Sequence, residues 1–247
     1  MHGRKYMLAP NTTYDRIAGT IPGEACARRD LIMDLSDALR RYDIDLFLYY
    51  TGDGPHLDEI IGPRFGFASP RGHVSEKFVT QWASVLEEHS LRYGSRIKGW
   101  WIDGCYRDFF GYTDELLAYY YRACKAGNSS CLVAMNNGIV GFEKKYPQEE
   151  FVCGEANDFL SIPSARFIDG AQTHLLAPLG LGVEGDEYSR WRTRGVHRDA
   201  AYMTDYIRRA NLAGMPVTID VYVGPDGARD EAQWECLRTI GEALTKE

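Results

Sequence analysis

The chain has 247 residues, of which 45% are hydrophobic, enough to bury one sizeable core. Its formal net charge of -7 argues against binding to nucleic acid or to an anionic membrane surface. No apolar run approaches the length of a transmembrane helix, and residues 1–5 lead into no signal peptide. The six cysteines are scattered without a C-x-x-C pair, so we expect reduced thiols in a cytoplasmic protein and no zinc site.

The first half of the chain is predicted to open with a loop and then to alternate helices and strands. Proline and glycine punctuate residues 1–29, where residues 6–9 form one short strand at most. Apolar spacing then predicts, in order, a helix at 30–42, a strand at 45–50, a long Gly- and Pro-rich loop at 51–72, a helix at 75–93, a strand at 97–103 and a helix at 113–125.

The second half continues the same alternation. It is predicted to contain, in order, strands at 131–135, 151–153 and 171–176, a long loop at 180–196, a helix at 198–213, a strand at 216–223 and a helix at 230–244. This order predicts a parallel sheet with right-handed crossovers. We therefore expect an α/β fold, a (β/α) TIM-type barrel truncated to about six strands, in a single domain over residues 1–247.

The strand at 97–103 carries the first candidate for chemistry. Its residues are apolar or aromatic up to Asp103, and Gly104 lets the backbone turn at once. Ligands of α/β proteins bind at the carboxyl ends of the strands. Asp103 is therefore a candidate nucleophile or base in a sugar-sized pocket; the alternative is an aspartate that caps the following helix.

The segment Trp101-Ile102-Asp103-Gly104 resembles the nucleophile segment of the α-L-fucosidases of glycoside hydrolase family 29. Five segments in the same order strengthen the resemblance, which covers roughly residues 9–244: Arg29-Asp30-Leu31, Leu48-Tyr49-Tyr50, Asn136-Asn137-Gly138, Val223-Gly224-Pro225-Asp226-Gly227 and Leu237-Arg238-Thr239-Ile240-Gly241. It implies an α-L-fucosidase-like hydrolase that removes a terminal α-L-fucoside with retention, as part of carbohydrate metabolism. No metal and no other cofactor are implied.

The resemblance also implies the two catalytic carboxyl groups. Asp103 matches the nucleophile, and Glu155 best matches the acid/base. Glu149 and Glu150 are rivals for the second role, and Glu155 is favoured because it ends a predicted strand. A retaining enzyme needs these two groups about 5–5.5 Å apart. The residues are distant in sequence, so only the fold can bring them together.

Four further residues are candidates for binding a small carbohydrate substrate. Side chains alternate along a strand, so one of Trp100 and Trp101, and one of Tyr49 and Tyr50, should face the site. We choose Trp101 and Tyr49, and add the two polar residues Asn136 and His174. For His174 a hydrogen-bonded place in the core is the alternative.

Two features depart from the family. The Lys-His-His-Asp-Gly strand that grips the sugar is not found, and Gln172-Thr173-His174 stands where the family has Trp-Glu. A barrel truncated to about six strands would also leave an open sheet edge, which favours a homo-oligomer. The alternative function is thus a catalytically impaired carbohydrate-binding or structural oligomer. In addition, the cluster Arg190, Arg192, Arg194 and His197 could recognise a sulfated sugar, or could be a solvated loop.

Overall fold

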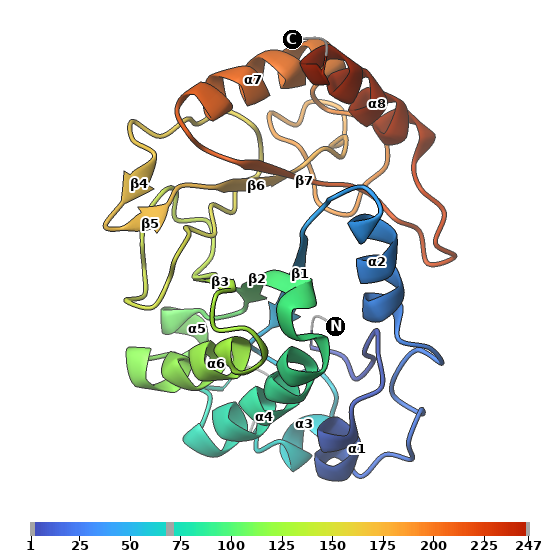
Figure 1. Cartoon of the computed structure of the whole chain (residues 1–247), viewed down its shortest axis with the longest axis vertical. Helices are drawn as coiled ribbons and strands as arrows, with labels where there is room; N and C mark the ends of the chain where they lie inside the picture. Colours follow the sequence, from blue (N-terminus) through green and yellow to red (C-terminus); the bar gives the residue numbers. More distant parts are fainter. Residues whose placement is uncertain (1–2, 68–71, 246–247) are drawn as a thin grey trace. The chain divides into compact units, whose positions relative to one another are not determined.

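The computed structural model describes residues 3–67 and 72–245, which form two compact units (Figure 1). The first unit comprises the chain up to Gly138 together with Lys145–Glu150, and the second comprises Ile139–Lys144 together with the chain from Phe151 onward. A single domain over residues 1–247 stays a prediction, and each unit is described by itself.

The first unit is built around a three-stranded parallel sheet in the order β1 (Leu46–Thr51), β2 (Ile97–Asp103) and β3 (Leu132–Met135). The middle strand β2 has a neighbour on both edges, and this position suits its continuous apolar run. Ile102 is fully buried within β2. The carboxyl ends of all three strands lie at the same edge of the sheet, because the strands are parallel.

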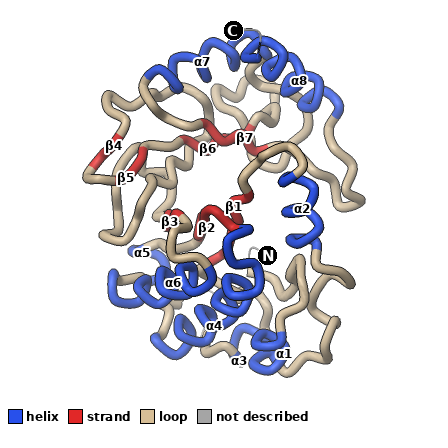
Figure 2. Tube along the Cα trace, viewed as in Figure 1, coloured by secondary structure: helices blue, strands red, loops and turns tan. Residues whose placement is uncertain are grey.

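Two long helices of the first unit, α4 (Glu76–Tyr93) and α6 (Asp114–Gly127), pack against each other. Both begin where the sequence predicts, because the hydroxyl groups of Ser75 and Thr113 accept hydrogen bonds from backbone N–H groups in the first helical turn. The remaining helices of this unit, shown in blue in Figure 2, are α1 (Thr12–Ala18), α2 (Leu31–Arg40), α3 (Ile61–Arg64) and α5 (Arg107–Phe110). A 3-10 turn, Gly94–Arg96, joins α4 to β2.

The second unit contains a two-stranded parallel sheet, β6 (Leu175–Pro178) with β7 (Val217–Asp220), and two helices, α7 (Ala200–Leu212) and α8 (Glu231–Thr245). Figure 1 shows α7 and α8 side by side, and the two helices are in contact. A separate antiparallel pair of short strands is formed by β4 (Phe167–Ile168) and β5 (Ala171–Gln172). The core of this unit includes Leu175, Met203 and Ile240.

Four of the expected loops and strands differ from the structure. The loop predicted at 1–29 contains α1, and the one predicted at 51–72 contains α3, although residues 68–71 lie outside the described part. The strand expected at 151–153 is reduced to an isolated parallel bridge between Phe151 and Gln172. The strand expected at 171–176 is divided into β5, which pairs antiparallel with β4, and β6, which pairs with β7. The single parallel sheet is therefore not seen within residues 3–67 and 72–245.

The fold class is confirmed at the level of a mixed α/β fold in which parallel strands alternate with helices. The parallel strands of the described residues form one three-stranded and one two-stranded sheet, so a truncated TIM-type barrel stays a prediction. Within residues 3–67 and 72–245, every helix is too short or too polar to cross a membrane.

Candidate active site

The carboxylate of Asp103, at the end of β2, accepts four hydrogen bonds within the first unit. Oδ2 accepts from the hydroxyl of Tyr49 at 2.6 Å. Oδ1 accepts from the amide of Asn136 at 2.9 Å, from the backbone N–H of Gly104 at 2.8 Å and from the hydroxyl of Tyr106 at 3.2 Å. Asp103 itself remains partly exposed. A carboxylate with this set of donors is fixed in orientation.

The register of the sheet explains why these side chains converge. Tyr49 lies opposite Trp101, and Thr51 lies opposite Asp103, so Tyr49, Trp101 and Asp103 share one face. The rings of Tyr49 and Trp101 stack with their centroids 5.6 Å apart. The alternate residues Trp100 and Tyr50 point to the other face and join the hydrophobic core. The expected division of the two tryptophans and the two tyrosines between the faces is confirmed.

Tyr49 acts as a neutral donor to Asp103. Burial of its hydroxyl, the negative charge of Asp103 and the hydrogen bond to Asp103 all raise the pKa of Tyr49 above its ordinary value. The phenol therefore keeps its proton throughout the physiological pH range. The neutral phenol donates a hydrogen bond to the carboxylate and adds no negative charge beside it.

Asn136 follows β3 and holds Asp103 from the neighbouring strand. Its side-chain oxygen accepts the backbone N–H of Gly138 at 3.0 Å, which assigns the amide nitrogen to Asp103. Its own backbone N–H donates to the carbonyl of Ile102 at 2.7 Å. Asn136 is completely buried. The contact that the structure gives to the side-chain amide of Asn136 is with Asp103, and the expected role of Asn136 in binding substrate stays a prediction.

The alternative interpretation of Asp103 as a helix cap is wrong. The helix that follows, α5, has Tyr106 at its N-cap position, and no side chain caps it. The only backbone N–H that the Asp103 carboxylate binds among the described residues is that of its neighbour Gly104. The side chain is therefore held by the site and does not serve the start of a helix.

Two residues of the site were missed by the sequence analysis. Tyr106 lies three residues after Asp103, and an aromatic residue in the turn that follows a strand is a signal that could have been used. Asp53 follows β1 and packs against Gly104: a Cβ on that glycine, which has φ +69°, would lie 3.2 Å from the Asp53 side chain. One carboxylate oxygen of Asp53 lies 3.0 Å from Nδ1 of His56. Asp53 is thus a second acid close to the Asp103 turn.

Glu155, the expected acid/base, belongs to the second unit, where backbone bonds to β6 position it. It forms an isolated parallel bridge with Leu176, whose backbone N–H donates to the carbonyl of Gly154 at 2.9 Å. Gly154 has φ +61°, and a Cβ there would lie only 1.7 Å from the carbonyl oxygen of His174. The side chain of Glu155 is partly exposed.

The two rival glutamates have structural contacts in the first unit. Glu149 is 3% exposed and accepts backbone N–H bonds from Met135, Lys145 and Tyr146, at 2.9–3.3 Å. Glu150 accepts the backbone N–H of Val133 at 3.1 Å and forms an ion pair with a lysine, Lys125, at 2.8 Å. Carboxylates bound in this way are poorly placed to exchange protons with a substrate.

His174 is 8% exposed, and both of its ring nitrogens have partners within the second unit. Nδ1 lies 3.0 Å from the carbonyl oxygen of Cys153, and Nε2 lies 2.7 Å from the hydroxyl of Thr218. Burial lowers the pKa of His174, which favours the neutral ring. These contacts match the alternative of a hydrogen-bonded core histidine, and a role in binding substrate stays a prediction.

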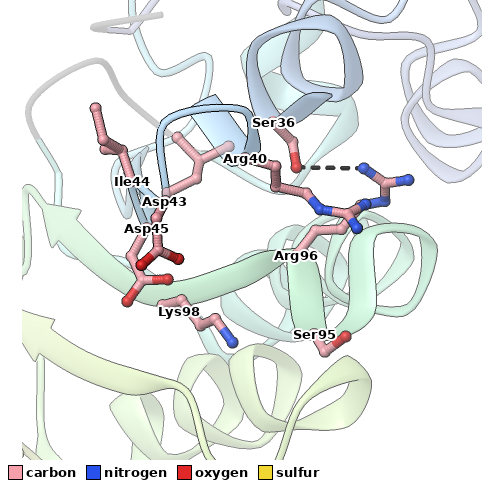
Figure 3. A pocket seen from close by; sticks show the side chains of 9 residues that line it. Ser36, Arg40, Asp43, Ile44, Asp45, Ser95, Arg96 and Lys98 are labelled. Atoms are coloured by element: carbon pink, nitrogen blue, oxygen red, sulfur yellow. Dashed lines mark hydrogen bonds between the residues drawn. The ribbon is translucent and has the colours of Figure 1, made fainter. Parts of the chain in front are cut away.

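A cavity of about 400 Å³ in the first unit lies away from Asp103 (Figure 3). Its lining includes Asp45, which directly precedes β1, and Leu46, the first residue of β1. It also includes Lys98, the second residue of β2. Figure 3 also shows the hydrogen bond between Arg96 and the hydroxyl of Ser36. Arg96 in addition forms an ion pair with Asp37. The cavity is therefore at the amino ends of the strands, whereas ligands of α/β folds bind at the carboxyl ends.

Within residues 3–67 and 72–245, no three His, Cys, Asp or Glu side chains are grouped so that they could hold a metal ion. Around Asp103 the structure brings together carboxyl, hydroxyl and amide groups. A fixed carboxylate beside an aromatic pair can act as a nucleophile or as a base.

No protein-family model and no curated protein matches the chain. Solved structures do match. An endo-fucoidan hydrolase of glycoside hydrolase family 107, MfFcnA4, superposes with a TM-score of 0.74 and 14% identity over 96% of this chain and 44% of that one. The α-L-fucosidase AlfC from Lactobacillus casei, in complex with α-L-fucose, gives a TM-score of 0.64 and 14% identity over 100% of this chain and 74% of that one.

A family 29 α-L-fucosidase from Bacteroides thetaiotaomicron, trapped as a covalent intermediate, gives a TM-score of 0.62 and 13% identity over 97% of this chain and 54% of that one. The chain thus spans less than half the length of the endo-fucoidan hydrolase and about half that of this fucosidase. The chain has a mixed α/β fold similar to that of glycoside hydrolases that act on fucosides and fucoidan. Membership of family 29 stays an expectation.

Proposed function

We propose that the protein is a retaining glycoside hydrolase that cleaves a terminal α-L-fucoside, with Asp103 as the nucleophile and Glu155 as the acid/base. The observation that carries the proposal is the carboxylate of Asp103, fixed by Tyr49, Tyr106, Asn136 and the Gly104 backbone at the carboxyl end of β2. The fold shared with fucose-active glycoside hydrolases supports the choice of reaction.

In the first step an oxygen of Asp103 attacks the anomeric carbon. Oδ1 has three donors and Oδ2 has one, so Oδ2 retains a lone pair for the attack. The glycosidic bond breaks as Glu155 gives its proton to the leaving oxygen, and an ester between Asp103 and the sugar forms. The trapped covalent intermediate of the Bacteroides enzyme is the kind of species that this step would produce.

In the second step the ionised Glu155 takes a proton from water, and the water oxygen attacks the anomeric carbon. The ester bond breaks, fucose is released with retained configuration, and the carboxylate of Asp103 is restored. The hydrogen bonds of Tyr49 and Asn136 stabilise the negative charge as it returns to Asp103. The ring of Tyr49, which is 45% exposed and stacks on the buried Trp101, offers an apolar surface for one face of the sugar.

The test compares wild type with Asp103→Ala in the hydrolysis of 4-nitrophenyl α-L-fucoside, with folding of both checked by circular dichroism. Loss of a nucleophile should lower kcat by at least about a thousandfold. Incubation of wild type with 2-fluoro-fucosyl fluoride should add one fluorofucosyl group, found on Asp103 by peptide mass spectrometry. An equally active Asp103→Ala variant would contradict the assignment. Sugar binding by a folded but inactive wild type would favour the carbohydrate-binding alternative.

A further inference from the structure

The second unit contains a pocket of about 260 Å³ that the mechanism above does not use. It is lined by Asn157 and by six consecutive residues of the long loop before α7, Asp186, Glu187, Tyr188, Ser189, Arg190 and Trp191. We propose that this pocket binds a neutral saccharide, the leaving group of the reaction. This proposal rests on the proposed function for the reaction that releases the saccharide. The chemical class of the ligand is argued from the residues that line the pocket.

The indole of Trp191 forms a fixed wall of the pocket. Its Nε1–H donates to the side-chain oxygen of Asn157 at 3.2 Å, and the residue remains partly exposed. This bond fixes the amide of Asn157 so that its nitrogen is available as a donor. An aromatic face beside amide and carboxyl groups is suited to a sugar, which has an apolar C–H face and a rim of hydroxyl groups.

The loop that carries Trp191 is held in place by a buried carboxylate. The side chain of Asp158 is 1% exposed and forms an ion pair with Arg198, at the start of the α7 segment. Oδ1 of Asp158 also accepts the hydroxyl of Ser189 at 3.0 Å. The backbone N–H of Arg190 donates to the carbonyl of Gly180 at 2.9 Å. The pocket wall is therefore tied at several points to the body of the unit.

The chain itself places this pocket next to the proposed acid/base. Asn157 is two residues after Glu155, so their Cα atoms are at most about 7 Å apart. The group that protonates the leaving oxygen must lie within hydrogen-bond reach of that oxygen. A leaving saccharide therefore lies beside Glu155, and the pocket that includes Asn157 is within reach of its first sugar residue.

The charges around the pocket favour a neutral ligand. Two acidic residues, Asp186 and Glu187, line it, and the guanidinium of Arg190 is paired with Asp186 at 3.1 Å. Two other members of the basic cluster, for which a sulfated sugar and a solvated loop were the two interpretations, have partners as well. Arg194 lies 3.6 Å from a carboxylate oxygen of Asp230, and Nε2 of His197 lies 3.1 Å from the carbonyl oxygen of Glu187.

The experiment compares two substrates that share the fucosyl group and differ in the leaving group. α-L-Fucosyl fluoride releases fluoride, which leaves the pocket empty, whereas a fucosyl-α1,6-N-acetylglucosamine disaccharide releases a sugar. Trp191→Ala should lower kcat/KM for the disaccharide by about threefold to about tenfold, the scale of one aromatic contact, and leave that for fucosyl fluoride within about twofold of wild type. Trp191→Phe should retain most of the disaccharide activity.

The matched control is Trp234→Ala, because Trp234 is 46% exposed on α8 in the same unit and does not line the pocket. This variant should hydrolyse both substrates like wild type. An equal loss on both substrates in Trp191→Ala, or no loss on the disaccharide, would overturn the proposal.

A binding measurement separates this proposal from the proposed function. Saturation-transfer NMR with N-acetylglucosamine, galactose and lactose requires no turnover. At least one of these sugars should bind folded wild type and lose its signal with Trp191→Ala, even if wild type hydrolyses no fucoside. The absence of binding by all three, or tighter binding of galactose 6-sulfate than of galactose, would refute a pocket for neutral saccharides.

Discussion

The hydroxyl of Tyr49 on β1 lies 2.6 Å from Oδ2 of Asp103, which ends the neighbouring strand β2. Thr51 lies opposite Asp103 in the register, and Tyr49 is two residues before Thr51 on the same strand. Side chains two residues apart share a face, so Tyr49 and Asp103 lie on one face of the sheet. The bond links an uncharged donor to the oxygen that we propose attacks the sugar. The role of this donor can be tested because a phenylalanine at position 49 removes the hydroxyl and leaves the shape of the ring almost unchanged.

Tyr49→Phe should lower kcat by about 10- to about 100-fold, the effect of losing one hydrogen bond to a charged group. The stack on Trp101 would remain, so KM should change little. Tyr50→Phe is the matched control: its hydroxyl donates to the carbonyl of Trp82 at 3.1 Å in the core, away from Asp103. This variant should lose about 1 kcal/mol of unfolding free energy and keep its activity. Equal activity of the two variants would contradict a role for Tyr49.

Glu155 and Glu149 can be distinguished by chemical rescue. Glu155→Gln should lower kcat for a fucoside with a poor leaving group by about 10²- to about 10⁴-fold, and azide should restore turnover of 4-nitrophenyl α-L-fucoside by giving fucosyl azide. Glu149→Gln replaces a carboxylate that accepts three backbone N–H bonds, so it should lower stability and show no azide product. Fucosyl azide formed by Glu149→Gln and not by Glu155→Gln would reverse the assignment.

The parts of the fold that local rules determine were predictable from the sequence. Ser75 and Thr113 begin α4 and α6 as their hydroxyl groups indicate, and the alternation along β2 places Trp101 and Asp103 on one face. Helix α1 was not predictable in this way. It has seven residues, and two of its backbone N–H groups donate to Glu88, which is 75 or more positions away in the sequence.

The candidate site was predictable only in part. Asp103, Tyr49, Trp101 and Asn136 meet because parallel strands place their carboxyl ends at one edge. The partners of His174 come from separate segments of the second unit, and no spacing in the sequence reveals such contacts. The homo-oligomer and the cytoplasmic location stay predictions, since contacts within one chain do not test them.

The geometry of Gly154 predicts that a methyl group there disrupts the segment that carries Glu155. Gly154→Ala would place a Cβ 1.7 Å from the carbonyl oxygen of His174, in addition to the strain of φ +61°. Gly170→Ala is the control, because Gly170 has φ +79° with nothing within 4 Å of the added methyl. Strain alone should cost Gly170→Ala about 1 kcal/mol in urea unfolding, and Gly154→Ala should lose clearly more. Equal losses would show that the clash is relieved without cost.

His89 makes the stability of the first unit depend on pH. The residue is 4% exposed on α4, its ring stacks on Tyr93 at 5.8 Å, and burial lowers its pKa from 6.5 to about 4, helped by the charge of Arg92. The unfolded chain therefore binds more protons than the folded chain between pH 4 and 6.5, and stability must rise with pH across that window. Acidification from pH 7 to pH 5 should remove about 2 kcal/mol of unfolding free energy through this residue.

The measurement is the free energy of unfolding in urea at several pH values between 4.5 and 7, for wild type and His89→Gln. Glutamine has no titrating group in this range, so the variant should lose less stability on acidification, and the two curves should converge toward low pH. His174, whose pKa is also lowered by burial, provides a second test in the other unit: His174→Gln should flatten the same dependence for the unfolding of that unit. Parallel curves for wild type and His89→Gln would mean that the imidazole is protonated without opening the core around α4.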